Sequence, residues 1–423
     1  MNTPRHSRPK GTLDFVPPVA DELRHLEYVA ARLSTRFGFR EIVTPVFEHT
    51  DVFTKSSGDA SDIVTKEMYS FKDRGERDLT LRPEGTPGVV RAVLENRLRI
   101  PVRLYYFGPY FRFGRPQKGR FREFRQYGVE AIGEASPYVD AEIVLLGDEF
   151  FRTLGISDCT TELNSIGCRA CRPGYRKELV AFLYAHKDEL CEDCRERMDR
   201  NPLRVFDCKN EGCREVVADA PKTAGHLCDD CADHYDGVKR ALDRMKVSYG
   251  INDRLVRGLD YYNRTVFEYI SSRLGAQDSL GGGGRYDYLV EDLGGPPTPS
   301  SGFALGIDRT MMAMPEKPPL PEGTQPPRES LAYVVWMGEE ELKHAVELAA
   351  KLRAEGVATR VDFDAARPKR QFRSADAAGA ACCVIVGPDE LAKGVYSLKD
   401  LATGEQEEVP VNMIVPRVRA LFR

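Results

Sequence analysis

The sequence predicts an α+β core with a mostly antiparallel sheet, a Cys-rich insertion within that core, and a C-terminal α/β domain. Strand-like apolar runs predominate on both sides of the cysteine-rich stretch. Eight of the eleven cysteines lie between Cys168 and Cys231, which is typical of an insertion with its own chemistry. From Leu331 onward, strand and helix patterns alternate, as they do in α/β domains.

Composition limits the classes of protein that are compatible with the chain. Its 423 residues suit two to four domains, and 42% apolar with 30% charged residues is typical of globular proteins. The net charge of −4 excludes a uniformly basic nucleic-acid-binding surface but allows a local basic patch. The sequence has neither an apolar run of about 18 residues nor an apolar segment near Met1. We therefore expect a cytoplasmic protein with reduced thiols and no membrane contact.

The elements of the first segment follow from apolar periodicity. A helix is predicted from Asp21 to Phe37, with Gly38 as its end, because apolar residues recur at spacings of three and four. A strand is predicted over 42–47, at a sheet edge or with a kink because it contains Pro45. Further strands are predicted at 104–107, 127–132, 256–270 and 301–307, the first two forming a hairpin with a long basic tip.

The last segment alternates between the two periodicities. Strands are predicted at 331–337, 357–363 and 381–386, and helices at 339–355 and 368–379. The neighbours Cys382 and Cys383 fall in the last apolar run, where small buried hydrophobic residues are expected. The predicted domains are 1–163 with 236–314 (core), 164–235 (insertion), 315–330 (a linker with six prolines in sixteen residues) and 331–423.

A basic run stands out in this acidic chain. Between Arg112 and Arg125 there are six basic residues and one acid, and phenylalanines flank them at 111, 113, 121 and 124. Arginine forks bind phosphate oxygens and aromatic rings stack on bases, so the combination suits a nucleotide. A solvated charged face is the alternative.

Four shorter motifs also combine polar groups with glycine. They are Leu81–Thr86, Arg257–Tyr262, Gly281–Asp287 and Gly302–Arg309. Each motif also has a purely structural interpretation. The acid of Leu81–Thr86 could stabilise a helix N-terminus, and Arg257–Tyr262 could be a polar turn. Gly281–Asp287 could be a flexible loop, and Gly302–Arg309 could combine a packing glycine with a surface arginine. The sequence contains no P-loop, no GxGxxG turn after a strand and no HExxH motif, which excludes the usual nucleotide and zinc-protease signatures.

In this order the motifs resemble those of histidine–tRNA ligases, which are class II aminoacyl-tRNA synthetases. The resemblance covers nearly the whole chain. It assigns Thr44–Phe53 to the dimer motif, Phe111–Glu130 to the ATP and acceptor-stem motif, and Gly302–Arg309 to the third class II motif. It also assigns Arg257–Tyr262 and Gly281–Tyr286 to the histidine-specific signatures, and 331–423 to the anticodon-binding domain.

The resemblance implies a two-step reaction in a homodimer. L-histidine and ATP would give histidyl-adenylate and pyrophosphate, and the histidyl group would then pass to tRNA(His) with release of AMP. ATP and Mg²⁺ are the implied cofactors. Arg257 and Arg112 are the implied catalytic residues at the α-phosphate, while Phe124 and Arg309 would help to hold ATP.

The same resemblance implies the residues that select histidine and contact tRNA. The histidine-binding set is Glu84, Thr86 and Gln126 at the α-amino group, Glu130 and Tyr262 at the imidazole, and Tyr286 nearby. Arg115 and Gln117 would meet the tRNA acceptor end. The chain departs from the family pattern at Gly114, where an acid that helps to position ATP is usual, and at Arg125, where histidine is frequent.

Two alternatives compete with the ligase. A non-catalytic regulatory subunit of ATP phosphoribosyltransferase, in histidine biosynthesis, shares the fold but typically lacks the anticodon-binding domain and catalytic residues. The presence of Arg112, Arg257 and Arg309 and of residues 331–423 favours the enzyme. A general RNA-binding module would not explain the carboxylates and tyrosines of the histidine site.

The clustered cysteines suggest structural zinc. Their spacing predicts two sets, Cys168, Cys171, Cys191 and Cys194 in one and Cys208, Cys213, Cys228 and Cys231 in the other. His226 or His234 could replace one ligand, and metal could supply folding energy to an insertion with few large apolar residues. Reduced cysteines without metal are the alternative.

Overall fold

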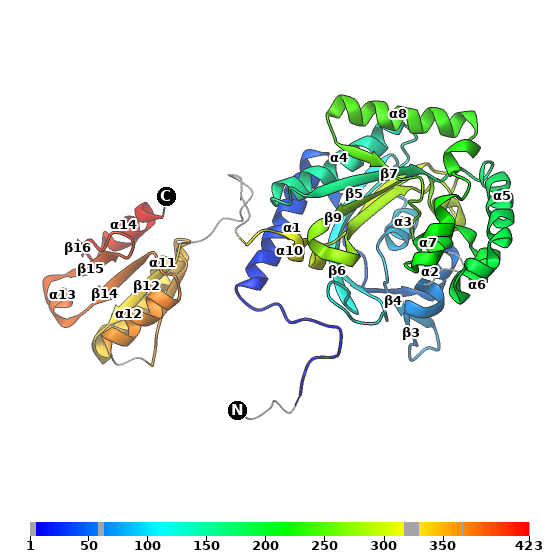
Figure 1. The fold of residues 1–423 in the computed structure, drawn as a ribbon. Coiled ribbons are helices and arrows are strands. Elements are labelled where there is room, and N and C mark those ends of the chain that lie inside the picture. Colours follow the sequence, from blue (N-terminus) through cyan, green and yellow to red (C-terminus); the bar gives the residue numbers. More distant parts are fainter. Residues whose placement is uncertain (1–5, 58–62, 317–329, 365–366, 423) are drawn as a thin grey trace. The chain divides into compact units, whose positions relative to one another are not determined.

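The computed structural model describes residues 6–57, 63–316, 330–364 and 367–422, and Figure 1 shows its elements. The chain divides into two compact units, Met1–Pro326 and Pro327–Arg423. Most of the predicted proline-rich linker, residues 317–329, lies outside the described residues. Each unit is described by itself.

An eight-stranded sheet forms the centre of the first unit. Its strand order is β1-β5-β6-β11-β10-β9-β7-β8, and every pairing is antiparallel except the outermost two, β1 with β5 and β7 with β8. This confirms the predicted, mostly antiparallel sheet. The strands are β1 (Arg40–Glu41), β5 (Val102–Phe111), β6 (Glu123–Ile132), β7 (Cys159–Ser165), β8 (Tyr249–Ile251), β9 (Asn263–Ser271), β10 (Ser279–Arg285) and β11 (Ser300–Gly306).

The two faces of this sheet carry different residues, because successive side chains of a strand point to opposite faces. On one face, Tyr127, Val129 and Ala131 of β6 are fully buried in the main core, which also contains buried residues of α1, α4 and α8. The alternate residues Gln126 and Glu130 belong to the other face. The helices of the main core and its surroundings are α1 (Val19–Arg36), α3 (Thr86–Glu95), α4 (Pro137–Thr153), α8 (Asp229–Met245), α9 (Leu289–Asp292) and α10 (Ile307–Ala313).

A smaller antiparallel sheet, in the order β2-β4-β3, carries the segment that leads into α3. The motif Leu81–Thr86 joins a strand to a helix, since β4 ends at Leu81 and α3 begins at Thr86. The elements here are β2 (Phe47–His49), α2 (Thr50–Ser57), the π-helical turn η1 (Ile63–Glu67), β3 (Tyr69–Lys72) and β4 (Asp78–Leu81).

The first predicted helix is confirmed and its end has a clear cause. Leu26, Val29, Ala30 and Leu33 of α1 are buried on one side. Gly38 then takes a φ of +79°, which favours glycine, and the next backbone N–H, that of Phe39, returns to the Ser34 carbonyl at 2.9 Å.

Two predicted strands are wrong in extent. Over 42–47 only Phe47 is in a strand; Pro45 lacks a backbone N–H for pairing, and Val43 is 84% exposed. Over 256–270 the strand β9 begins only at Asn263, and the preceding residues form a loop at the candidate site.

The glycine run forms a strand, so its alternative interpretation as a flexible loop is wrong. A Cβ atom on Gly283 would lie 2.0 Å from the carbonyl oxygen of Gly302 on the neighbouring strand β11. Glycine therefore allows β10 to approach its neighbours closely.

The cysteine-rich insertion is helical and leaves and rejoins the sheet at one edge. It follows β7 and returns through α8 to β8, which pairs with β7. Figure 1 shows α5, α6 and α7 gathered at one side of the unit. These elements are α5 (Arg172–Ala185), η2 (Lys187–Glu189), α6 (Glu192–Arg200), η3 (Pro202–Asp207), α7 (Glu211–Ala218) and η4 (Thr223–His226); η5 (Ser272–Gln277) lies elsewhere, between β9 and β10.

The predicted grouping of the cysteines is wrong. The structure nests the pairs, with Cys168, Cys171, Cys228 and Cys231 in an outer tetrad and Cys191, Cys194, Cys208 and Cys213 in an inner tetrad. The cause is the fold of the insertion, whose two ends meet at the sheet while its middle folds back on itself. Neither histidine joins a tetrad: His234 contacts Asp140 at 2.8 Å and His226 contacts Glu178 at 3.3 Å.

The second unit confirms the α/β alternation and adds to it. Its sheet has the order β13-β12-β14-β15-β16, with parallel pairing among the first three strands and antiparallel pairing among the last three. Cys382 and Cys383 are buried in β14, as expected. Its elements are β12 (Ala332–Trp336), α11 (Glu339–Ala354), β13 (Thr359–Val361), α12 (Pro368–Ala377), β14 (Cys382–Val386), α13 (Pro388–Lys393), β15 (Val395–Asp400), β16 (Gln406–Pro410) and α14 (Ile414–Leu421).

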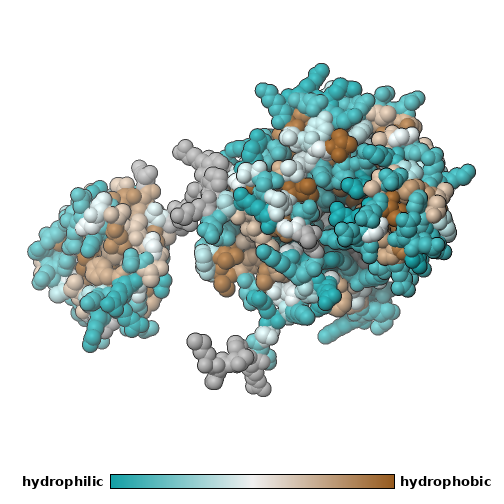
Figure 2. Space-filling view, viewed as in Figure 1, coloured by the Kyte–Doolittle hydropathy of each residue, from teal (hydrophilic) through white to brown (hydrophobic). Residues whose placement is uncertain are grey.

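Within the described ranges, every helix is too short or too polar to cross a bilayer. The faces of both units that are visible in Figure 2 are mostly hydrophilic, with smaller hydrophobic areas between.

Candidate active site

A cavity of about 270 Å³ lies on the sheet face opposite the main core. It is lined from the β4–α3 turn, the β5–β6 hairpin, the loop before β9, and strands β10 and β11 with the start of α10. Eight predicted site residues meet there: Glu84, Thr86, Arg112, Phe124, Gln126, Arg257, Tyr262 and Arg309. Residues far apart in the sequence are thus brought to one place by the strand order.

One end of the cavity is cationic. Arg309 is fixed by hydrogen bonds from Nε to the Gly119 carbonyl (2.8 Å) and from Nη1 to the Ser279 carbonyl (2.9 Å). Arg112 donates from Nε to the Pro83 carbonyl (2.9 Å), and its guanidinium carbon lies 5.3 Å from the centre of the Phe124 ring. Burial and the nearby cations Arg120 and Arg112 lower the pKa of Arg309. The mutual repulsion of these cations would be relieved by a bound polyanion.

Arg257 lies beside this cationic end. Its Nη1 donates to Glu268 of β9, and Glu268 also accepts a hydrogen bond from Ser279 Oγ at 2.7 Å. The Nε atom of Arg257 is buried and has no partner in the described part of the chain. Glu268 therefore orients the guanidinium of Arg257, which lines the cavity.

Another set of lining residues presents hydrogen-bond acceptors. Glu84 Oε2 accepts a hydrogen bond from Tyr261 Oη at 2.6 Å. The hydroxyl of Thr86 donates to Glu130 at 2.6 Å and keeps its lone pairs. The buried Gln126 Oε1 lacks a partner among the residues that the structure describes. Three acceptors in one place suit a ligand with several N–H groups.

Glu130 and Tyr286 are predicted site residues that lie behind the cavity lining. Glu130 is fully buried and accepts hydrogen bonds from the hydroxyls of Thr86, Tyr106 (3.1 Å) and Tyr286 (2.5 Å). Burial raises the pKa of Glu130 to about 8, although these hydroxyls oppose the shift. A Cβ atom on Gly302 would lie 2.1 Å from Glu130 Oε2, so glycine there makes room for this carboxylate.

Arg115 and Gln117 are exposed in the loop between β5 and β6 and do not line the cavity. Near them, a Cβ atom on Gly114 would lie 3.1 Å from Arg120 Nε. Position 114 has no acidic side chain, and Arg120 pairs with Glu67 of η1. An acid from another segment therefore approaches this arginine.

Sequence reasoning missed several residues that shape the cavity. Arg120 and Tyr261 line the cavity. Arg120 belongs to the basic run 112–125 and Tyr261 to the motif Arg257–Tyr262, so both could have been predicted as site residues. Glu67, Tyr106 and Glu268 act through a neighbouring side chain. Nothing in their local sequence points to the site, because the fold alone brings them there.

A buried ion network supports the glycine-rich signature from outside the cavity. Arg285, 1% exposed, donates from Nη2 to Asp140 Oδ1 at 2.6 Å, and His234 meets the other oxygen of Asp140 at 2.8 Å. Although burial opposes it, these two partners lower the pKa of Asp140 to about 2. The network ties β10 to α4 and α8.

Family models match both units. The model described as histidyl-tRNA synthetase matches residues 11–310, and the one described as anticodon binding domain matches residues 331–421. The chain is 44% identical over 418 residues to a histidine–tRNA ligase of Natranaerobius thermophilus, and 46% identical over 420 residues to one of Moorella thermoacetica, with 98% of each chain covered in both cases.

Solved structures agree with this likeness. A histidyl-tRNA synthetase of S. aureus, solved without ligands, is similar at a TM-score of 0.79 and 33% identity, covering 97% of this chain and 99% of that one. A Bacillus halodurans structure described as an ATP phosphoribosyltransferase regulatory subunit/histidyl-tRNA synthetase has a TM-score of 0.62 at 21% identity, covering 88% of this chain and 97% of that one, and shows the shared fold alone.

Proposed function

The chain belongs to the histidyl-tRNA synthetase family, and from this premise we propose how its cavity ligates L-histidine to tRNA(His) at the expense of ATP. The product of the first step is histidyl-adenylate, with release of pyrophosphate, and transfer of the histidyl group to tRNA releases AMP. The observation that carries the residue assignment is the single cavity that joins a cationic end to a cluster of acceptors.

The cationic end is the proposed site of the ATP phosphates. Arg112 would hold the α-phosphate and Arg309 the distal phosphates, because both are fixed through Nε and line the same cavity. Phe124 lies against Arg112 and would stack on the adenine. Arg120 is a third cation near the phosphates.

Arg257 is the proposed catalytic residue of adenylation. The histidine carboxylate attacks the α-phosphorus, and negative charge grows on the phosphate oxygens as the bond to pyrophosphate breaks. A pre-oriented guanidinium between the carboxylate and the phosphate stabilises that charge without reorganising. Glu268 supplies the orientation.

The cluster of acceptors is the proposed site of the histidine α-amino group. An ammonium has three N–H donors, and Glu84, Thr86 and Gln126 each offer an acceptor on the cavity lining. Gln126 Oε1, which has no partner in the described part of the chain, gains one in this arrangement.

Glu130 and Tyr262 are the proposed partners of the two imidazole nitrogens. Two hydroxyls use Oε1 of Glu130 and one uses Oε2, so Oε2 retains an acceptor position. Tyr286 holds this carboxylate from behind. A substrate analogue without the matching N–H would leave this acceptor position without a partner, which disfavours the analogue.

Magnesium fits as a partner of ATP more than as a resident ion. The only carboxylates among the described lining residues are Glu84 and Asp308, and each already accepts a hydrogen bond, from Tyr261 Oη and from the Arg125 backbone N–H. We propose that Mg²⁺ is held mainly by phosphate oxygens. There it would neutralise part of their charge.

The exposed β5–β6 loop and the second unit are the proposed tRNA contacts. Arg115 and Gln117 would meet the acceptor end, and 331–423 would bind the anticodon.

A homodimer is proposed through Thr44–Phe53, where Val46 is 41% and Phe47 49% exposed, beside Val43. Apolar side chains exposed together are typical of a protein contact.

Histidine-dependent ATP–pyrophosphate exchange without tRNA is the test. We expect exchange with L-histidine and no other standard amino acid, and we expect Arg257→Ala to slow it by a factor of about 100 or more while the circular dichroism spectrum is unchanged. Arg152→Ala, at an exposed arginine of α4, is the matched control and should leave exchange unchanged.

The regulatory-subunit alternative makes the opposite prediction. Such a protein would bind without catalysing, so wild-type protein would give no exchange above background. Exchange that is equally fast in the Arg257→Ala variant would refute the role of this residue.

A further inference from the structure

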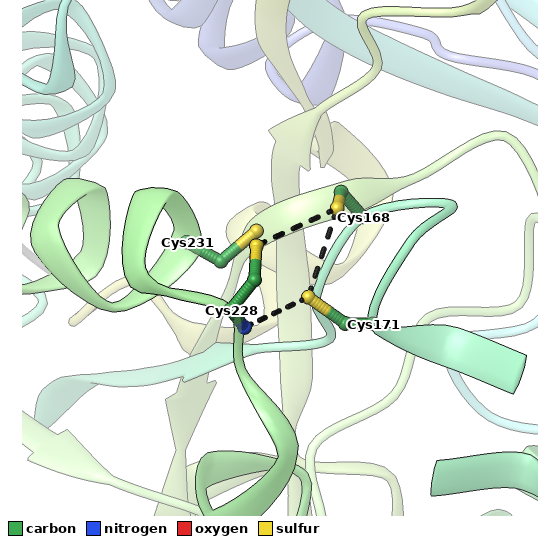
Figure 3. A group of neighbouring side chains, drawn as sticks. All are labelled: Cys168, Cys171, Cys228 and Cys231. Carbon is green, nitrogen blue, oxygen red and sulfur yellow. Dashed lines mark hydrogen bonds between the residues drawn. The ribbon is translucent and has the colours of Figure 1, made fainter. Parts of the chain in front are cut away.

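The eight clustered thiols form two compact tetrads. Within each tetrad all sulfur atoms lie within 4.8 Å of one another. Figure 3 shows the outer tetrad, in which the side chains of Cys168, Cys171, Cys228 and Cys231 converge from the starts of α5 and α8. All eight are free cysteines, so disulfides do not explain their approach.

The sulfur positions match the edges of a zinc tetrahedron. Zinc bound at about 2.3 Å by four thiolates places neighbouring sulfurs about 3.8 Å apart. The Cys168–Cys171 and Cys168–Cys228 separations are 3.6 and 3.9 Å, and the Cys191–Cys208 separation is 3.8 Å. A disulfide would need about 2.0 Å.

Backbone hydrogen-bond donors are directed at sulfur atoms of both tetrads. Backbone N–H groups of Cys228 and Cys191 point at the sulfurs of Cys171 and Cys213, both at 3.1 Å. Cys171, Cys191 and Cys228 stand at the N-cap positions of α5, α6 and α8, and their side chains make no capping hydrogen bond in the described structure. Hydrogen bonds from the backbone to ligand atoms are typical of metal sites.

The inner tetrad is embedded in the small core of the insertion. Cys194 and Cys213 are fully buried there among Leu179, Leu183 and Met198. Cys191 and Cys208 are partly buried and pack against the same core, so without metal four unpaired thiol groups would converge at its edge. A single ion bound by all four would link α6, η3 and α7.

The same insertion supports the loop that carries Arg257. Asn201, between α6 and η3, donates from Nδ2 to Asp260 at 2.8 Å. Arg172, which directly follows Cys171, donates to the carbonyl of Tyr262. Behind the loop lies a second cavity of about 240 Å³, lined by these residues of the insertion and by Val256, Leu259 and Asp260. The loop before β9 therefore lies between the active-site cavity and the cysteine-rich insertion.

We propose that each tetrad binds one structural zinc ion and that the two ions together hold the loop 257–262 in position for histidine adenylation. The inner ion fixes the turn that carries Asn201, and the outer ion fixes the start of α5 that carries Arg172. The positioning part rests on the proposed function, whereas the metal part does not. Arg257 and Tyr262 touch substrate; the cysteines act only through them.

Metal content of the full-length protein, purified without chelator, tests the first part. We expect two zinc ions per chain by mass spectrometry of the metal, and no reaction of the eight thiols with a thiol reagent in the native state. Cys208→Ser and Cys228→Ser should each lower the content to about one ion per chain. Cys382→Ser, in the second unit, is the matched control and should retain two. Sub-stoichiometric zinc with all eight thiols reactive would overturn the proposal.

Kinetics of ATP–pyrophosphate exchange test the second part. Cys208→Ser should lower kcat and raise the KM for histidine by a larger factor than the KM for ATP, because the loop contributes Tyr262 to the histidine site. Cys208→His, which retains a zinc ligand, should recover both the ion and much of the activity. Loss of zinc with unchanged kinetic constants would overturn the positioning role. Wild-type protein that binds two zinc ions but shows no exchange would contradict the proposed function and leave the metal sites standing.

Discussion

At the scale of single residues, Glu130 makes the stability of the first unit depend on pH. Its pKa is raised from 4.5 to about 8 by burial, so the folded protein keeps a proton that the unfolded chain releases. Stability from this group is fully present below about pH 4.5 and is lost as the pH rises toward about 8. Glu130→Gln should remove this loss. Urea midpoints, followed by circular dichroism at about pH 5 and about pH 8, should differ less in the variant than in the wild type.

An exposed residue provides the control for that measurement. Glu22→Gln on α1 should keep the wild-type difference between the two pH values, because this carboxylate is solvated. If Glu130→Gln and wild type lose the same stability over this range, the buried carboxyl is not the cause.

The types of many site residues could be predicted from the sequence, but their partners could not. Arg112, Arg257 and Arg309 stand in motifs rich in glycine and charge, and all three line the cavity. Glu268 and Tyr106 were missed because each is an ordinary residue of a strand. Their hydrogen bonds depend on which strands are neighbours, which local sequence does not specify.

At the scale of elements, the Asp140–Arg285 pair joins α4 to β10 and makes a strong prediction. Arg285→Met would leave the fully buried Asp140 without its main counter-charge, at a cost of about 3–5 kcal/mol in the free energy of unfolding. The double variant with Asp140→Leu should be less destabilised than Arg285→Met alone. Chemical denaturation measures all three.

A surface ion pair serves as comparison for the buried one. Arg169→Met removes an exposed partner of Asp292 on α9 and should cost at most about 1 kcal/mol. Equal costs at Arg285 and Arg169 would show that burial is not what makes the Asp140 pair important.

Elements with long periodic patterns were predictable, and short polar ones were not. Helix α1 shows a regular apolar stripe, whereas β15 and β16 mix apolar with polar and charged residues, and β16 is mostly exposed, so neither was predicted. The strand predicted over 42–47 fails because apolar residues there are exposed, which an apolar pattern cannot reveal. The cysteine grouping fails for a similar reason, since spacing alone does not distinguish sequential from nested pairs.

At the scale of the whole molecule, the two units should separate the two chemical steps. Removing 331–423 should leave histidine-dependent exchange within about two-fold of the full chain, because the cavity is built entirely from the first unit. Charging of tRNA(His) should fall by a factor of about 10 or more, since the match to the anticodon binding domain lies in the removed part. Normal charging by the truncated protein would contradict this division.

The truncated protein should also remain a dimer by light scattering. The proposed contact at Thr44–Phe53 lies in the first unit, and its exposed Phe47 offers a site for disruption. Phe47→Asp should yield monomers, whereas the truncation should not.

The nested arrangement of the cysteines has a consequence for the order in which the insertion assembles. Joining Cys191 to Cys208 closes a loop across 17 positions, while joining Cys168 to Cys228 closes one across 60. The entropy lost on closing the longer loop is greater by roughly 1 kcal/mol at room temperature. Metal added to the unfolded chain in limiting amount should therefore populate the inner thiols first. The middle of the insertion would then fold first around the inner tetrad. The outer tetrad, at the junction with the sheet, would form last.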